Sequence, residues 1–232
     1  FMGSSNLTSI SIPSSVTTIG SYIFSSCKSL TTITIAEGNQ KYDSRDNCNA
    51  IIETQKNTLI IGCQGTTIPN SVTTIGAEAF YACPQLTSII IPNSVTTIGF
   101  LAFGNCTNLT SITIPNSVTT IESQAFSDCS SLTSITLSNR ITTIEASVFE
   151  GCSRLTSITI PNSVTTIGYM AFEKCQGLTS ITLPNSLKTI GGLAFSLCDA
   201  LKSITIPNSV TTIGDNAFQD CSSLTSIDIP NS

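Results

Sequence analysis

Cysteine offers this chain the most chemistry, and its spacing is regular. Of ten cysteines, seven recur every 23 residues from Cys83 to Cys221, and Cys27 belongs to the same set. Thiols can ligate zinc or form disulfides, but the chain has no histidine and no Cys-x-x-Cys pair to support a metal site. Because a residue at the same place in every repeat lies in a column along the molecule, we interpret these thiols as reduced, small apolar side chains that fill a core.

The sequence lacks the combinations of residues that the common catalytic sites require. Without histidine, Ser-His-Asp and Cys-His nucleophiles are excluded. The run Ser25-Ser-Cys-Lys28 fits Ser-x-x-Lys, but no Ser-Asp-Asn or Lys-Thr-Gly accompanies it. We therefore predict that the chain is not an enzyme and uses no cofactor. The acidic residues of the repeats fall at variable, outward positions typical of solvated surface, namely Glu122, Asp128, Glu145, Glu150, Glu173 and Asp220.

One loop concentrates oxygen-bearing side chains that are able to ligate Ca²⁺. It carries Glu37, Asn39, Asp43, Asp46 and Asn47. Their spacing does not match an EF-hand loop. Acidic turns are usually solvated, so a solvated turn is the preferred interpretation and a calcium site the alternative.

The repeat itself explains the rest of the chain. One copy runs from Leu155 to Gly177, and we call the repeat a coil. About nine coils stack into a single solenoid over residues 1–232, and both ends fall inside a repeat, as expected for a piece of a longer array. Regular coils begin at Leu7, Leu86, Leu109, Leu132, Leu155, Leu178 and Leu201, and a degenerate one fits Cys63 to Gln85.

Each coil has three predicted parts. Leu-x-x-Ile-x-Ile alternates apolar and polar residues, which predicts a short strand with Ser and Thr outside. Pro-Asn-Ser ends it, and Val-Thr-Thr-Ile returns the chain across the far side. In Ala-Phe-x-x-Cys the apolar spacing predicts about one turn of α- or 3₁₀-helix.

Residues 37–62 are a predicted insertion of a polar loop followed by a β-hairpin. The hairpin centres on Gln55-Lys56 and pairs Ile51 with Ile60. This places Cys48 opposite Cys63, so a cross-strand disulfide and two packed thiols are both compatible with the sequence.

Composition limits the possible partners. Charged residues make up 10 % of the chain and the net charge is -5, with no basic stripe for nucleic acid or an anionic membrane surface. The longest apolar runs, such as Ser88-Ile-Ile-Ile91, are far shorter than the roughly 20 residues of a membrane-spanning helix.

The repeat Leu-x-x-Ile-x-Ile-Pro-x-Ser-Val-x-x-Ile-Gly-x-x-Ala-Phe-x-x-Cys resembles that of the BspA-like leucine-rich repeat family over essentially the whole chain. The insertion, from Tyr42 to Cys63, also resembles a block that interrupts such arrays in gut bacterial proteins. The resemblance implies a leucine-rich-repeat solenoid from a secreted or cell-surface bacterial protein, of a kind associated with adhesion to host matrix, host cells or other bacteria. It implies no catalytic residues.

We expect the outward hydroxyls of the first strand to form a ladder on one continuous sheet, the face that commonly binds proteins in this class. Binding hot spots favour Trp, Tyr and Arg, which the ladder lacks, so a hydrated surface is an equal interpretation. The leading hypothesis is an extracellular module that binds proteins or glycans, and the alternative is a structural spacer without a ligand. The predicted site residues are Ser111, Thr113, Ser134, Thr136, Ser157, Thr159, Ser180, Thr182, Ser203 and Thr205, together with Ser88 at the edge.

Overall fold

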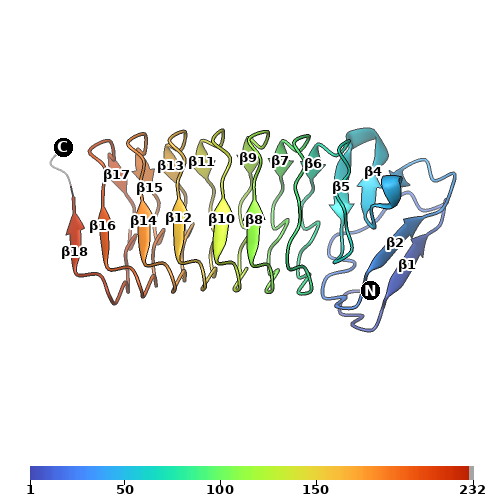
Figure 1. Ribbon diagram of the computed structural model, residues 1–232, viewed down its shortest axis with the longest axis horizontal. Helices are drawn as coiled ribbons and strands as arrows, with labels where there is room; N and C mark the ends of the chain where they lie inside the picture. The colour runs from blue at the N-terminus through green and yellow to red at the C-terminus, as the bar shows by residue number, and fades with distance from the viewer. Residues whose placement is uncertain (230–232) are drawn as a thin grey trace.

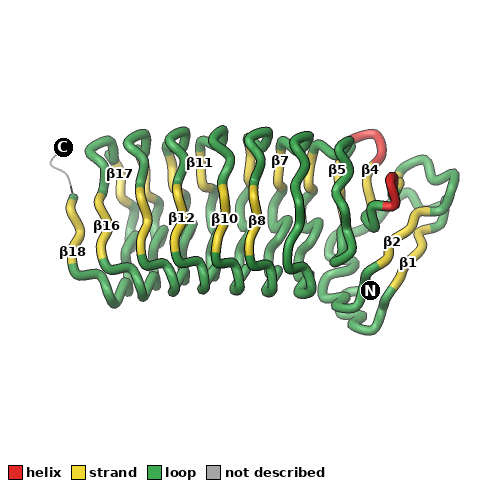
Figure 2. The backbone as a smooth tube through the Cα atoms, in the orientation of Figure 1, coloured by secondary structure: helices red, strands yellow, loops and turns green. Residues whose placement is uncertain are grey.

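The computed structural model describes residues 1–229; the end of the last partial repeat, residues 230–232, lies outside the described part. The chain winds into an elongated β-solenoid in which each repeat makes one coil (Figure 1). Helix is confined to two short segments near one end (Figure 2). The predicted repeat solenoid with one short parallel strand per coil is confirmed.

The first strands lie on one side of the solenoid, which we call the strand face; the coils that begin at Cys63 and Leu86 run along this face without forming a strand. Alternation places the central isoleucine of a first strand in the core, as for Ile112 and Ile158, and its two neighbours outside. A proline without an amide hydrogen then ends the strand. These strands are β1 (Ser9–Ile12), β2 (Thr32–Ile35), β8 (Ser111–Thr113), β10 (Ser134–Thr136), β12 (Ser157–Thr159), β14 (Ser180–Thr182), β16 (Ser203–Thr205) and β18 (Ser226–Asp228).

The strand face is not the continuous sheet that we expected. Its strands pair in parallel two by two: β1 with β2, β8 with β10, β12 with β14 and β16 with β18. Within residues 1–229, no ladder joins β10 to β12 or β14 to β16. A three-residue strand that ends before proline offers few amide donors, so a small change in coil spacing is enough to remove a ladder.

The return strands lie on the opposite side and pair over longer runs. Most Val and Ile side chains of the return segments, such as Val164 and Ile167, are fully buried, whereas Ile213 in the last return strand is exposed. One sheet contains β11, β13, β15 and β17, and the other contains β6, β7 and β9 together with three strands of the insertion. The strands are β6 (Thr74–Ile75), β7 (Thr97–Ile98), β9 (Thr120–Ile121), β11 (Thr143–Ile144), β13 (Thr166–Ile167), β15 (Thr189–Ile190) and β17 (Thr212–Ile213).

The expected helical turn at Ala-Phe-x-x-Cys is wrong. In the described part of the chain the regular coils contain no helix, and each turn instead holds two residues with positive φ, such as Met170 at 56° and Lys174 at 59°. The reason is hydrogen bonding between coils. The amides of Met170, Phe172 and Lys174 donate to carbonyls of the next coil at 2.8–3.0 Å, so they cannot serve a helix.

The core is a stack of identical side chains. Phe80, Phe103, Phe126, Phe149, Phe172, Phe195 and Phe218 form a column with ring centroids 5.1–5.9 Å apart. The predicted cysteine column lies beside it, and eight of the ten thiols are buried and all are free. No coil can cover its own apolar side chains, so stability comes from the neighbouring coils.

The insertion holds β3 (Tyr42–Asp43), η1 (Arg45–Asn47), β4 (Ile51–Glu53), η2 (Thr54–Lys56) and β5 (Thr58–Ile61). Strands β4 and β5 are antiparallel, but Ile51 pairs with Ile61 and not with Ile60 as expected, because η2 and the left-handed Asn57 lengthen the loop. Cys48 and Cys63 are free thiols. Strand β5 then pairs in parallel with β6, so it takes the place of a return strand.

The coil that holds the insertion has no Ala-Phe-x-x-Cys turn. It therefore separates its two neighbouring coils on the strand sides but not on the turn side. On the turn side the neighbouring coils meet directly, with Tyr22 and Tyr81 edge to face and the amide of Ser26 donating to Ala82 at 3.1 Å. The buried side chains divide into two clusters, one of them formed by the N-terminal coils and the insertion. In Figure 1, β1 and β2 are correspondingly tilted against the other strands.

Candidate functional site

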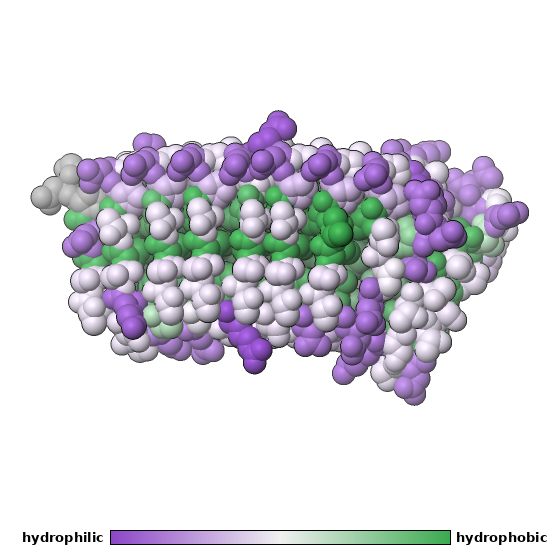
Figure 3. Space-filling model, in the orientation of Figure 1, coloured by the Kyte–Doolittle hydropathy of each residue, from purple (hydrophilic) through white to green (hydrophobic). Residues whose placement is uncertain are grey.

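The ten predicted site residues lie together on the strand face. All ten are exposed, and they form two columns along the solenoid, one of serines and one of threonines. The parallel register places Ser134 beside Ser111 and Thr136 beside Thr113. Figure 3 shows this face as rows of pale side chains across β8 to β18, with apolar side chains visible between the rows.

The hydroxyls of these columns differ from those of the threonines that precede them. Thr133 Oγ1 donates to the carbonyl of Thr110 at 3.1 Å, and Thr179 Oγ1 donates to Thr156 at 3.1 Å, so these hydroxyls serve the solenoid. Within residues 1–229, none of the ten site hydroxyls has a protein partner. They are therefore available to a ligand or to water.

Sequence reasoning missed the residue at which the face departs from this pattern. Ile90 stands in the threonine column and is 87 % exposed, the largest exposure of any bulky apolar side chain in the described chain. The signal was present in the sequence, because alternation in Ser88-Ile-Ile-Ile91 assigns Ile90 to the outside.

Two hollows flank Ile90 on the strand face. The first, of about 490 Å³, lies between residues 66–70 and 88–93. The second, of about 420 Å³, lies between residues 88–93 and 111–115. Both are lined by hydroxyl, amide and aliphatic groups, and Figure 3 shows the face becoming more apolar beyond β8 toward the N-terminal coils.

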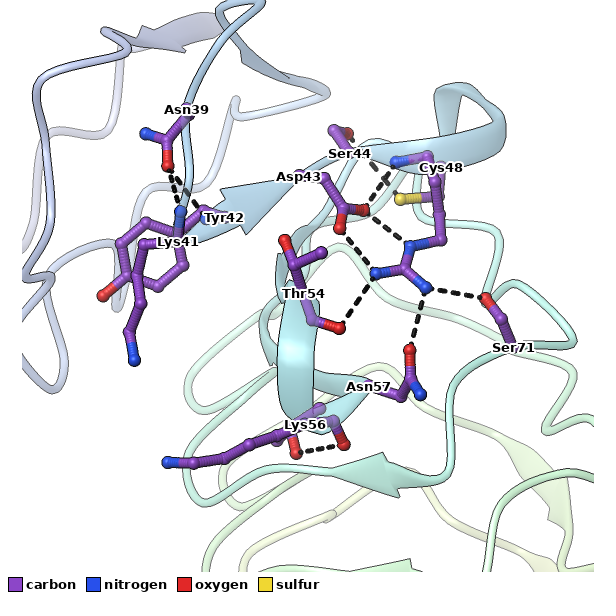
Figure 4. Close-up of polar contacts among 12 residues, drawn as sticks. Asn39, Lys41, Tyr42, Asp43, Ser44, Cys48, Thr54, Lys56, Asn57 and Ser71 are labelled. Atoms are coloured by element: carbon purple, nitrogen blue, oxygen red, sulfur yellow. Dashed lines mark hydrogen bonds and ion pairs between the residues drawn. The ribbon is translucent and has the colours of Figure 1, made fainter.

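The oxygen-rich loop of the insertion is an internal brace. Arg45 Nε donates to Asp43 Oδ1 at 2.7 Å and Arg45 Nη1 donates to Asn57 Oδ1 at 2.9 Å (Figure 4). Burial disfavours ionisation of Asp43, but hydrogen bonds from Arg45 and Thr54 outweigh it and lower the pKa of that carboxyl. Asn39 Oδ1 accepts the amides of Lys41 and Tyr42, both at 2.9 Å. The side-chain oxygens of Asn39 and Asp43, two of the five candidate calcium ligands, therefore serve protein donors.

One of the acidic residues that we expected to be solvated is buried. Glu173 is 8 % exposed and contacts Lys174, with Nζ 3.4 Å from Oε1. Lys174 also reaches Glu150 of the preceding coil at 3.3 Å. The position that follows Phe is buried in several coils, as at Ser127, Glu173 and Ser196, which the outward assignment did not anticipate. Groups of three or more His, Cys, Asp or Glu side chains able to hold a metal ion are absent from residues 1–229.

Parallel coils with a Leu, Ile, Phe and Cys core define a leucine-rich-repeat solenoid, a class of fold that is generally a non-enzymatic binding scaffold. The chain belongs to the BspA type leucine rich repeat family, whose repeat region matches residues 1–61, 60–176 and 142–232. No curated protein matches the sequence. No helix in the described residues has the length and apolar character needed to span a membrane.

Solved bacterial structures agree with this assignment. A leucine-rich repeat protein from Eubacterium ventriosum is 32% identical with a TM-score of 0.86, over 97% of this chain and 61% of that one. A leucine-rich repeat protein from Bacteroides ovatus is 34% identical with a TM-score of 0.75, over 100% and 51%. A leucine rich cell surface protein from Faecalibacterium prausnitzii is 34% identical with a TM-score of 0.54, over 97% and 48%. The chain thus spans about half to three fifths of these relatives.

Proposed function

We propose that the chain is an extracellular recognition module that binds proteins or glycans of host matrix, host cells or other bacteria through its strand face. The observation that carries this proposal is the set of ten exposed hydroxyls without protein partners, next to threonines whose hydroxyls are engaged. Such hydroxyls both donate and accept hydrogen bonds. Repeated along the solenoid, they provide many weak contacts to one extended ligand.

The proposed location is secreted or at the cell surface. The support is the Faecalibacterium prausnitzii relative, which is described as a cell surface protein and is 34% identical over 97% of this chain. The scarcity of charge also fits a module that meets other surfaces without strong long-range attraction or repulsion.

A structural spacer without a ligand is the second candidate. The uniform stack of coils favours it, since ring spacings of 5.1–5.9 Å along the Phe column leave little variation from coil to coil. A spacer needs only length and stiffness, and a repeated core supplies both.

Binding of the purified chain to matrix proteins, mucins, bacterial surfaces and glycans separates the two candidates. The control is a variant in which Ser134, Ser157 and Ser180 are all changed to Arg, because these exposed positions accept a larger side chain without disturbing the core. Saturable binding that the triple variant loses supports recognition by the strand face. A folded chain that binds nothing on the panel supports the spacer.

A further inference from the structure

Ile90 is the one bulky apolar side chain in the outward columns of the strand face within residues 1–229. The other coils carry a polar residue at this position: Thr in most of them, as in Thr113 and Thr136, Ser at Ser11 and Asp at Asp228. Exposure of 87 % means that no neighbouring coil covers it. Its side chain gives nothing to the stability of the solenoid, so a role in packing does not explain it.

The backbone around Ile90 is also free. The amides of Ser88, Ile89 and Ile90 donate to no protein carbonyl in the described chain. Within residues 1–229, the segment is joined to the next coil only at Thr87, whose carbonyl accepts the amide of Thr110 at 3.2 Å and its hydroxyl at 3.3 Å. The two hollows of about 490 and 420 Å³ lie in these open seams. Volumes of roughly 300–1,000 Å³ are typical of sites for small ligands.

The lining of both hollows is entirely uncharged. It combines the aliphatic side chain of Ile90 with the amides of Asn70 and Asn93 and the hydroxyls of Ser88, Ser111 and Thr113. Side-chain amides and hydroxyls each donate and accept, which matches the hydroxyls of a sugar. The C–H face of a pyranose ring is apolar and fits against an aliphatic side chain.

We propose that the two hollows around Ile90 are a binding site for a neutral glycan, with one sugar in each hollow. This inference rests on the proposed recognition function and names its ligand class. A sialylated or sulfated glycan would lose hydration of its charge without gaining a cationic partner, and the net charge of -5 also repels it. A protein ligand is less well matched, because the lining offers no Trp, Tyr or Arg anchor.

Ile90→Thr is the decisive variant. It restores the residue found at this position in the regular coils and removes only an exposed side chain, so the fold and the melting temperature should not change. Ser11→Ile is the matched control, because it places the same apolar side chain in the same outward column, three coils away, at an exposed residue that lies outside the ten candidate site residues and lines neither hollow. The probe is an array of neutral oligosaccharides with sialylated and sulfated counterparts.

We expect the unmodified chain to bind neutral members of the array, Ile90→Thr to lose at least tenfold in affinity, and Ser11→Ile to bind as the unmodified chain does. The double variant with Ile90→Thr and Ser11→Ile should stay weak, which separates a specific site from non-specific hydrophobic binding. Neutral glycan binding that survives Ile90→Thr overturns the inference, and so does preference for charged glycans.

The same array, run beside the protein panel, distinguishes this inference from the function on which it rests. If the chain binds a protein through the strand face and no glycan, the glycan site is wrong while recognition stands. If the folded chain binds neither glycans nor proteins, both proposals fail.

Discussion

The thiol of Cys152 donates a hydrogen bond to the backbone carbonyl of Phe126, 26 residues earlier, at 3.3 Å. That carbonyl also accepts the amide of Cys129 in its own turn, at 3.3 Å. Each Phe carbonyl of this kind therefore serves its own coil and the next one. The same thiol bond joins Cys27 to Phe1, Cys106 to Phe80, Cys129 to Phe103, Cys175 to Phe149, Cys198 to Phe172 and Cys221 to Phe195.

The buried thiols predict a loss of stability at alkaline pH. Burial, with a smaller effect of neighbouring cysteines, raises the pKa of Cys106, Cys129, Cys152 and Cys175 well above the ordinary 9.0. Above that value the unfolded chain releases thiol protons and the folded chain keeps them, so the free energy of unfolding falls as pH rises. Each such thiol contributes about 1.4 kcal/mol per pH unit once the unfolded thiol is ionised.

Denaturant titrations from pH 7 to 10.5 in the presence of a reductant measure this effect. Cys152→Ala should cost about 1–2 kcal/mol at pH 7, from lost packing and the lost hydrogen bond. Above pH 9 the free energy of unfolding of this variant should fall less steeply than that of the unmodified chain. The difference in slope is the contribution of one thiol, about 1.4 kcal/mol per pH unit. Equal slopes for the two proteins would contradict this assignment.

Phe172→Ala should remove about 3–5 kcal/mol from the free energy of unfolding. The ring is fully buried between Phe149 and Phe195, with centroids 5.3 Å from each, so truncation leaves a cavity in the middle of the column. Thermal and denaturant unfolding measure the loss. Tyr169→Ala, three residues away on the surface, should change stability little, and a similar loss there would mean that the column is not the source.

The left-handed turn residues predict a stabilising glycine. Gln124 has φ of 59° and its side chain has no protein hydrogen-bond partner in the described chain, so Gln124→Gly should raise stability by about 0.5–1 kcal/mol. Its neighbour Ser123 does not have positive φ, and Ser123→Gly should instead lower stability by a similar amount. Melting temperatures of the two variants, compared side by side, test the opposite signs.

Arg45 is expected to hold the insertion against the coil that follows it. Its guanidinium contacts Asp43, Asn57 and, at 3.3 Å, Ser71 Oγ. Arg45→Ala should cost about 1–3 kcal/mol because Asp43 loses its charged partner in a partly buried place. Hydrogen exchange should quicken in residues 36–62 before it does in the C-terminal coils. Lys56→Ala, which removes an exposed ion pair to Glu53, serves as the control and should leave exchange unchanged.

The repeated residues made most of the fold predictable. A column of Phe, Cys or Ile at one place in every coil has to be inward, because only neighbouring coils can cover it, and the positions of Phe172 and Cys175 follow directly. Alternation likewise assigned Ser157 and Thr159 to the surface. The exposed columns of the candidate site were therefore accessible from sequence.

Features decided by backbone hydrogen bonds between coils were not predictable. Met170 and Lys174 carry no sequence signal for positive φ, since neither is Gly or Asn, and the bonds to the next coil impose it. The pairing of first strands in twos has no counterpart in a nearly uniform repeat. The hollows around Ile90 depend on this interrupted pairing, so the sequence marked the residue but not its surroundings.

The coil that holds the insertion and lacks an Ala-Phe-x-x-Cys turn determines where the axis of the solenoid changes direction. Phe80 packs over Gly62, where an added Cβ would lie 2.1 Å from the ring, so the column ends here without leaving an open ring face. A stack of identical coils has a single straight axis. A coil that contributes backbone on two sides of the solenoid and none on the turn side makes a corner in that axis. The position of such a corner along the array, rather than any change in the repeats, fixes where the solenoid bends (Figure 1).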